Sequence, residues 1–403
     1  MLKPKTIINM KPKLLALLLS ITLSPLSLFA QTFVQRYADI ANQTSQTNIT
    51  NYLTEYEALG VKYRNTQALE NAYQWLVNKY TGFGYTASQL STDTYSYSGS
   101  TCKNLVVTKV GTLYPNTYVI VCGHYDSITG TGTNDNGSGV ASILEMARLL
   151  KDVNTEYSIK FINFSGEEDG LKGSQHYVSS VVNGTTPKMN IRLVFNLDEV
   201  GGVAGMTNNT ITCERDTNGT PSTNNAASSA MTNELITCVG LYSPLQTTLS
   251  YAYASDYMPF QANNEIITGF FETNETTHKH TATDLLVNMD PVYNFKVAKA
   301  ATGALLHFAK AETTLSVNNF EKDFQVSFFP NPTKDSIHIN MGNLETSSYD
   351  FTITDINGKS VLNKRIFNPK LIEAVSIEGL SKGMYLMTLN SGDKKISKKI
   401  VIE

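Results

Sequence analysis

The sequence is poor in cysteine and in charge. Its 403 residues include four cysteines, and 32 basic residues stand against 35 acidic ones, so charged residues make up 17% of the chain. Four cysteines are too few for a fold held together mainly by disulfides, and a chain of this length can bury a large core. The formal net charge of −3 lacks the basic excess typical of nucleic-acid binders. We therefore expect no nucleic-acid partner.

Long apolar runs are also missing, except near the N-terminus. Four lysines precede an apolar run over residues 14–30, which is interrupted by Pro25 and three serines. This pattern predicts a signal peptide over residues 1–30 rather than a membrane anchor, which needs ~20 apolar residues. Residues 31–47 are either a short propeptide or a flexible segment. No later segment approaches membrane-spanning length, so we expect no permanent transmembrane helix.

Between residues 48 and 312, apolar runs of strand length alternate with helical patterns. The predicted strands cover residues 105–110, 118–122, 159–164, 193–197 and 266–271, and the clearest helices cover 65–81 and 138–150. Such alternation predicts an α/β domain with a mixed, largely parallel, doubly wound sheet flanked by helices. Sites in sheets of this kind lie at the carboxyl ends of the strands.

Acidic and imidazole side chains follow these predicted strands. They are His124, Asp126, Asp135, Glu167, Glu168, Asp198, His278 and His280. A single histidine or a pair of adjacent glutamates is common on protein surfaces and carries little information. Several such residues at one edge of a sheet carry more information than any one of them alone. Imidazole and carboxylate groups together are ligands that suit Zn²⁺ or a similar divalent ion.

Five motifs in this region carry a more specific signal. They read GHYDS at 123–127, NDNGSG at 134–139, SGEEDGLKGSQHY at 165–177, NLDEVG at 196–201 and HKHTATD at 278–284. In this order they resemble the co-catalytic di-zinc aminopeptidases of peptidase family M28, over roughly residues 48–310. The resemblance implies a zinc exopeptidase fold, two Zn²⁺ ions with Co²⁺ or Mn²⁺ as possible substitutes, and peptide substrates with a free N-terminus.

The resemblance also implies which residues bind the metals. His124 and Asp198 match the ligands of one zinc ion, Glu168 and His280 match those of the other, and Asp135 matches the carboxylate that bridges the two ions. Three carboxylates would then offset most of the charge of two divalent ions, whose burial is otherwise costly.

Two further residues have implied roles in the chemistry. Glu167 matches the general base for metal-activated water, and Asp126 matches the acid that orients the imidazole of His124. His278 competes with His280 for the last ligand position. We favour His280 because the family motif places histidine directly before a threonine, here Thr281.

Other activities remain open on the same fold. Glutaminyl cyclases share the architecture and use one zinc ion, while carboxypeptidases and dipeptidases need a cation for a free carboxylate, for which Arg192 and Arg215 are available. A non-catalytic adhesion domain would have lost metal ligands, and none is missing here. Residues 251–260 and 270–271 could line a side-chain pocket, or they could be ordinary core aromatics.

The four cysteines fall within the enzymatic region. Export permits disulfides, and we expect the pairs Cys102–Cys122 and Cys213–Cys238. The alternative is that all four are buried thiols.

After a predicted linker at 313–319 the pattern changes to short alternating strands. They cover residues 325–329, 336–340, 349–354, 371–377 and 385–389, and they predict a small all-β sandwich over residues 320–403. The segments FFPNPTKDSIHI, ITDINGKSV and LSKGMYLMTLNSGDKKISKKIVI resemble the C-terminal sorting domain of the type IX secretion system. That implies export through the periplasm, outer-membrane secretion machinery as a partner, and a secreted or cell-surface protein. A carbohydrate-binding or spacer module is the alternative.

Overall fold

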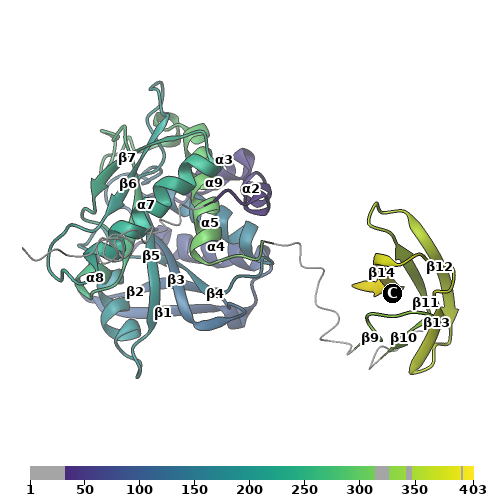
Figure 1. Ribbon diagram of the computed structural model, residues 1–403. Helices are drawn as coiled ribbons and strands as arrows, with labels where there is room; N and C mark the ends of the chain where they lie inside the picture. Colours follow the sequence, from purple (N-terminus) through teal and green to yellow (C-terminus); the bar gives the residue numbers. More distant parts are fainter. Residues whose placement is uncertain (1–31, 314–325, 342–346, 392–393) are drawn as a thin grey trace, which may run out of the picture. The chain divides into compact units, whose positions relative to one another are not determined.

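An eight-stranded mixed sheet forms the centre of the larger of two units, residues 1–313 and 314–403. The computed structural model describes residues 32–313, 326–341, 347–391 and 394–403 (Figure 1). The signal peptide predicted over residues 1–30 lies outside the described residues, as does nearly all of the predicted linker. Among the helices that are described, none has the length and apolar character needed to cross a membrane.

The sheet has the strand order β1-β2-β4-β3-β5-β8-β6-β7. The strands are β1 (Leu90–Tyr97), β2 (Ser100–Lys109), β3 (Tyr114–His124), β4 (Tyr157–Phe164), β5 (Asn190–Leu197), β6 (Thr210–Arg215), β7 (Gln246–Tyr251) and β8 (Ile267–Glu272). The pairs β4–β3, β3–β5, β5–β8 and β6–β7 are parallel, and the remaining pairs are antiparallel. The predicted mixed, largely parallel sheet is therefore confirmed.

Helices cover both faces of this sheet. They are α2 (Gln35–Ala41), α3 (Gln46–Ala58), α4 (Gln67–Gly82), α5 (Gly137–Leu150), α6 (Lys172–His176), α7 (Asn225–Tyr242), α8 (Met258–Ala262) and α9 (Pro291–Phe308). Successive side chains of β3 point to opposite faces of the sheet. Val119 and Val121 belong to the apolar cluster that includes residues of α5, α7 and α9. Ile120 and Cys122 belong to a second cluster, on the other face, with Phe260 of α8.

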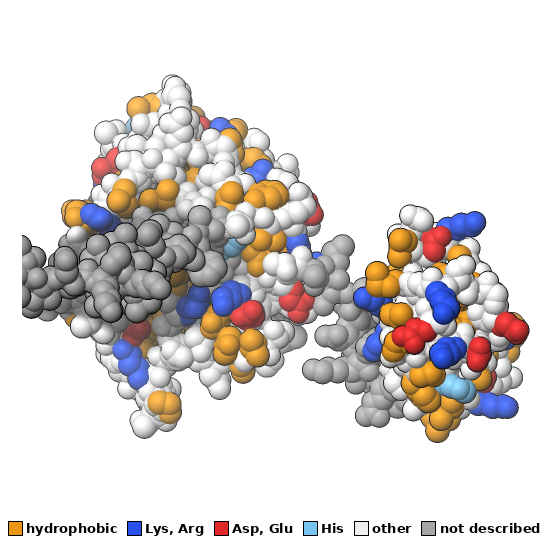
Figure 2. Space-filling model, viewed as in Figure 1, with side chains coloured by type: hydrophobic (Ala, Val, Ile, Leu, Met, Phe, Trp, Pro, Cys, Tyr) orange, Lys and Arg blue, Asp and Glu red, His pale blue; other side chains and the backbone are white. Residues whose placement is uncertain are grey.

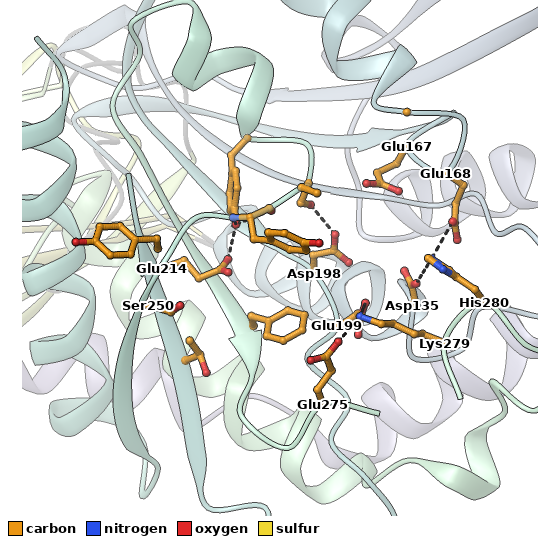
Figure 3. A pocket seen from close by; sticks show the side chains of 18 residues that line it. Asp135, Glu167, Glu168, Asp198, Glu199, Glu214, Ser250, Glu275, Lys279 and His280 are labelled. Carbon is orange, nitrogen blue, oxygen red and sulfur yellow. Dashed lines mark hydrogen bonds and ion pairs between the residues drawn. The ribbon is translucent and has the colours of Figure 1, made fainter. Parts of the chain in front are cut away.

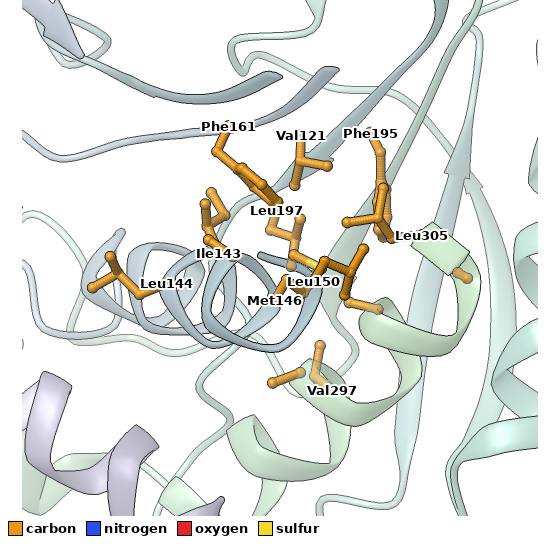
Figure 4. Packing of buried hydrophobic residues seen from close by; sticks show 14 of the residues in the cluster. Val121, Ile143, Leu144, Met146, Leu150, Phe161, Phe195, Leu197, Val297 and Leu305 are labelled. Carbon is orange, nitrogen blue, oxygen red and sulfur yellow. The ribbon is translucent and has the colours of Figure 1, made fainter. Parts of the chain in front are cut away.

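The larger core lies between the sheet and helices α5 and α9 (Figure 4). Val121, Phe161 and Phe195 point from three adjacent strands toward Ile143 of α5 and Leu305 of α9, and all five are fully buried. Burying a side chain of this kind contributes about 1.5–3 kcal/mol. This packing holds the carboxyl ends of β4, β3 and β5 in fixed positions.

Part of the segment 31–47 is helical and packs against the core. Residues 35–41 form α2, whose Tyr37 and Ala41 are buried against the core, and the hydroxyl of Tyr37 donates to the carbonyl of Ala311. An apolar face on this helix gives it a place in the core, which the sequence prediction overlooked.

The predicted disulfides are wrong. All four cysteines lie in described parts of the chain, and none forms a disulfide. Cys102 is on β2 and Cys122 is on β3, with β4 between them. Two strand spacings amount to roughly 10 Å, beyond the reach of a disulfide. Cys213 and Cys238 are buried in the main core, where thiols pack as small apolar groups.

The smaller unit consists of two antiparallel sheets. One has the order β13-β10-β9 and the other β12-β11-β14-β15. The strands are β9 (Ser327–Phe329), β10 (Ser336–Asn340), β11 (Ser348–Thr354), β12 (Ser360–Phe367), β13 (Ile372–Ser376), β14 (Gly383–Ser391) and β15 (Lys394–Ile402). Ile337 and Ile339 of one sheet and Phe351 and Leu389 of the other belong to one apolar cluster. The all-β character predicted for this region is confirmed.

Among the described residues in view in Figure 2, neither unit shows a continuous patch of one charge. On the faces visible in Figure 2, acidic and basic side chains are interspersed among uncharged ones.

Candidate metal centre

The predicted ligands lie where three parallel strands end. His124 is the last residue of β3, Glu167 and Glu168 follow β4, and Asp198 follows β5. Because β4, β3 and β5 are neighbours in the sheet and run parallel, these side chains reach the same edge. His280 arrives from the loop after β8 and faces Asp135 and Glu168 (Figure 3).

Asp135 lies between the two imidazoles. Its Oδ1 is 3.1 Å from Nε2 of His124, and its Oδ2 is 3.1 Å from Nε2 of His280. Nε2 of His280 is also 3.1 Å from Oε2 of Glu168, and Nε2 of His124 is 3.3 Å from Oδ1 of Asp198. The five predicted ligands therefore converge, with Asp135 shared between two groups.

The loop before α5 positions Asp135. The side chain of Asn136 caps the helix by accepting from the backbone N–H of Gly139 at 2.9 Å, and it donates to the carbonyl of Leu197 at 2.9 Å. The cap ties the loop to the end of β5, and Asp135 is 4% exposed. An acid at this point is held rigidly, as a bridging ligand requires.

Asp126 lies beneath the loop that carries the two glutamates. Its carboxylate accepts from the backbone N–H groups of Glu167 and Glu168, each at 3.3 Å. The same carboxylate is 3.7 Å from Nδ1 of His124, while the backbone carbonyl of Asp126 is closer, at 3.3 Å. Asp126 therefore contacts His124 through its backbone and holds the loop through its side chain.

Glu167 stands beside the cluster rather than within it. Its Oε2 is 4.0 Å from Nε2 of His124, and burial raises its pKa well above the ordinary value. Burial likewise raises the pKa of Glu168, to about 8, with a further contribution from Asp135. The two adjacent glutamates thus differ in position, with Glu168 facing His280 and Glu167 facing His124.

The residues of this cluster fit a divalent metal. His124 Nε2 and Asp198 Oδ1 are buried atoms without a hydrogen-bond partner. Ligand atoms of His124, Asp135 and Glu168 lie within 4.8 Å of one another. Burial lowers the pKa of His124, but the nearby carboxylates, Asp198 first, raise it well above its ordinary value. Such a concentration of buried negative charge calls for cations, and imidazole with carboxylate suits zinc.

The structure distinguishes His280 from His278. Nδ1 of His278 lies 2.8 Å from the hydroxyl of Thr283, whereas Nε2 of His280 lies 3.1 Å from Asp135. His280 has φ 55°, in the left-handed region, which turns its side chain back toward Asp135.

Sequence reasoning missed several residues that support the centre. The hydroxyl of Ser255 donates to Oδ2 of Asp198 at 2.5 Å, and the buried carboxyl of Asp256 lies next in the chain. Asp284 accepts from the backbone around Asp135. Asp284 is the last residue of the HKHTATD motif and could have been found there, but nothing in the sequence around Ser255 marks it.

A cavity of about 580 Å³ opens beside the cluster. Besides the predicted ligands, its walls include Glu199, Thr212, Glu214, Ser250, Tyr251, Tyr253, Tyr257, Phe271, Glu275 and Lys279. The expectation of aromatic lining is met by the tyrosines and Phe271, whereas Phe260 and Phe270 are buried in the cores. Arg192 donates to the carbonyl of Phe308, and Arg215 donates to the hydroxyl of Tyr251.

Comparison with known families and proteins agrees with this geometry. The sequence model described as Peptidase family M28 matches residues 104–304, and that of the Secretion system C-terminal sorting domain matches residues 327–403. Aminopeptidase YwaD of Bacillus subtilis is 40% identical over 108 residues, which cover 26% of this chain and 23% of the relative. A probable zinc metalloprotease of Pyrenophora teres f. teres is 29% identical over 249 residues, 54% of this chain and 52% of the relative. The chain thus spans only part of the length of these relatives.

Solved structures share the fold of the larger unit. The LapA aminopeptidase of Legionella pneumophila superimposes with a TM-score of 0.58 at 21% identity, covering 68% of this chain and 74% of that one. A glutaminyl cyclase of Macrostomum lignano gives a TM-score of 0.59 at 14% identity, covering 68% and 93%. At these identities the likeness establishes the fold alone.

Proposed function

Because this chain contains a peptidase family M28 domain followed by a secretion-system sorting domain, we propose that it is an exported zinc aminopeptidase that removes residues from the free N-terminus of peptides. The observation that carries the proposal is the position of the Asp135 carboxylate, with one oxygen 3.1 Å from His124 and the other 3.1 Å from His280. We assign the peptidase domain to residues 48–312, preceded by the packed helix α2, and the sorting domain to residues 320–403.

Two zinc ions are the proposed cofactors. His124 and Asp198 would hold one, Glu168 and His280 would hold the other, and Asp135 would contribute one oxygen to each. Co²⁺ or Mn²⁺ could replace zinc in the same donor set, since both accept imidazole and carboxylate ligands. Bound zinc ions would lower the pKa of a water molecule and stabilise the negative charge that develops on the scissile carbonyl.

Glu167 is the proposed proton carrier. It accepts a proton from the attacking water and passes it to the departing amine, which is general base followed by general acid catalysis. Its burial supports this role, because a carboxyl in a poorly solvated position holds a proton more readily than one in water. Asp126 positions the same group by holding the backbone N–H of Glu167 at 3.3 Å.

The charges around the cavity favour an amino terminus over a carboxyl terminus. A carboxypeptidase needs a cation available for the substrate carboxylate. The basic residue in the cavity wall, Lys279, is already paired with Glu199 at 3.2 Å and with Glu275. A wall rich in carboxylates attracts a substrate ammonium group and repels a carboxylate.

Glutaminyl cyclase activity is the second candidate, because a cyclase shares the fold. That reaction would release ammonia from peptides with N-terminal glutamine and leave the peptide bond intact. Mass analysis of a glutaminyl peptide after incubation separates the two activities, since hydrolysis removes a whole residue.

The decisive assay combines substrates with metal analysis. Aminoacyl-nitroanilides should be cleaved, N-acetylated versions should not, excess chelator should abolish cleavage and added Zn²⁺ should restore it. Cleavage of the acetylated substrates at equal rates, or full activity in chelator, would overturn the proposal.

The sorting domain indicates secretion through the type IX system. We propose that the outer-membrane machinery of that system is its partner and that the enzyme acts outside the cell or on its surface. Deleting residues 320–403 should leave the peptidase in the periplasm, and normal export of the shortened chain would contradict this role.

A further inference from the structure

The wall of the cavity away from the metal centre is built by the strands β6, β7 and β8. Along β6, Ile211 and Cys213 are buried in the main core, so Thr212 and Glu214 point to the opposite face, where both line the cavity. In the ladders Glu214 lies opposite Ser250 of β7 and Gly269 of β8. This register places a carboxylate on the cavity wall between a hydroxyl and a residue without a side chain (Figure 3).

The position of Glu214 is closely defined. Its Oε2 accepts from the hydroxyl of Tyr257 at 2.6 Å, and the residue is 6% exposed. A Cβ atom at Gly269 would lie 3.1 Å from that oxygen and 2.8 Å from the Tyr257 ring. Glycine is therefore required opposite Glu214 for the carboxylate and the tyrosine to meet.

Glu214 differs from Glu199 and Glu275, the other acids that line the cavity beyond the metal cluster, because no cationic side chain in the described segments pairs with it. Glu199 and Glu275 both pair with Lys279. Within the part of the chain that the structure describes, no basic side chain forms an ion pair with Glu214. A buried carboxylate without a cation is costly when ionised, and burial raises the pKa of Glu214 to about 8. A cation entering the cavity would supply the missing charge.

The surroundings of this carboxylate suit a long side chain with a charged end. Tyr251 and Phe271 line the same cavity. Lysine and arginine lay their apolar stems along aromatic surfaces and keep the charged group beyond them. Thr212 and Ser250 also line the cavity, with Ser250 opposite Glu214 in the ladder, and their hydroxyls can accept further hydrogen bonds from an ammonium or guanidinium group.

Building on the proposed aminopeptidase function, we infer that Glu214 selects peptides whose N-terminal residue is lysine or arginine. The carboxylate faces the cavity that the proposed metal ligands also line, and among the described residues no basic side chain pairs with it. An N-terminal Ala, Leu or Phe would bring no cation to this carboxyl group.

The experiment compares lysyl with norleucyl substrates, which share the length of the stem and differ in the charged end. In the full-length zinc-loaded enzyme, kcat/KM for lysyl-nitroanilide should exceed that for norleucyl-nitroanilide by at least tenfold. Glu214→Gln keeps the shape and the acceptor for Tyr257, and it should reduce this ratio about tenfold while norleucyl turnover changes less than threefold. Glu265→Gln, a similarly buried glutamate paired with Lys188 outside the cavity, is the matched control and should keep the ratio.

Binding of lysinamide and norleucinamide, measured by calorimetry, gives a second readout that needs no turnover. Tighter binding of lysinamide than of norleucinamide by the wild type, lost in Glu214→Gln, supports the inference. If the same enzyme cleaves no nitroanilide, the proposed aminopeptidase function is wrong while the assignment of Glu214 stands. Equal binding of the two amides, or faster cleavage of the norleucyl substrate by the wild type, overturns the assignment of Glu214.

Discussion

The carboxylate of Asp284 accepts the backbone N–H of Asp135 at 3.0 Å across 149 residues of sequence. Its other oxygen accepts the N–H of Asn134 at 2.8 Å. The loop that carries the proposed bridging ligand is thereby tied to the loop that carries His280. Two proposed ligands, from distant parts of the chain, are thus linked through one buried acid.

Replacing Asp284 should therefore weaken the centre without removing a ligand. In Asp284→Asn one of the two acceptors becomes a donor that faces an N–H group. We expect kcat and zinc affinity to fall by about 10- to 100-fold, as for other residues that orient metal ligands. Metal titration and kinetics on the folded variant measure this. Asp152→Asn, at an exposed residue, is the control, and equal effects of the two changes would contradict the proposed role of Asp284.

The two adjacent glutamates should respond differently to the same substitution. Glu167→Gln removes the proton acceptor, so we expect kcat to fall about 10²- to 10⁴-fold with the zinc content unchanged. Glu168→Gln removes a proposed ligand 3.1 Å from His280, so zinc should be lost as well. Atomic absorption after gel filtration distinguishes the two effects. Zinc loss in both variants would mean that Glu167 is itself a ligand.

The two nearby histidines provide a similar contrast. His280→Ala should lower the zinc content and the rate, because His280 faces both Asp135 and Glu168. His278→Ala removes a contact to Thr283 and should leave the zinc content at the wild-type value. Activity and metal content are measured on both variants. The opposite result would exchange the roles of the two residues.

His307 should make the peptidase unit less stable in acid. Burial lowers its pKa to about 4 in the folded protein, whereas the unfolded value is about 6.5. The unfolded chain thus binds the proton first, so stability decreases as the pH falls from about 6.5 and the loss is complete below about 4. Allowing for its partial exposure, we expect a loss of about 1–2 kcal/mol.

The variant His307→Gln keeps an acceptor for the Tyr242 hydroxyl, which lies 2.7 Å from His307, and cannot be protonated. Thermal unfolding of both proteins at pH 7.5 and pH 4.5 compares them. The variant should lose less stability between these values than the wild type, and an identical pH dependence would show that His307 does not contribute.

Much of the fold was accessible from the sequence because burial leaves a strong pattern. The runs at 118–122, 159–164 and 193–197 are mostly apolar, as is typical of strands covered on both faces, and each coincides with a central strand. The edge strands β1 and β7 were not predicted, because their side chains are largely polar and exposed. The disulfide predictions failed because sequence spacing does not reveal that β4 lies between Cys102 and Cys122.

The candidate metal ligands could also be found by reading along the chain, since all five belong to the short motifs and three of them lie at or just after the ends of strands. The sequence by itself thus indicated the resemblance to peptidase family M28, the order of the candidate ligands and the all-β module at the end. Only the tertiary structure decided that Asp284 supports Asp135, that Ser255 supports Asp198, and that Glu214 faces the cavity opposite Gly269. These relations depend on strand order and register, which join residues far apart in the chain and leave no local pattern in it.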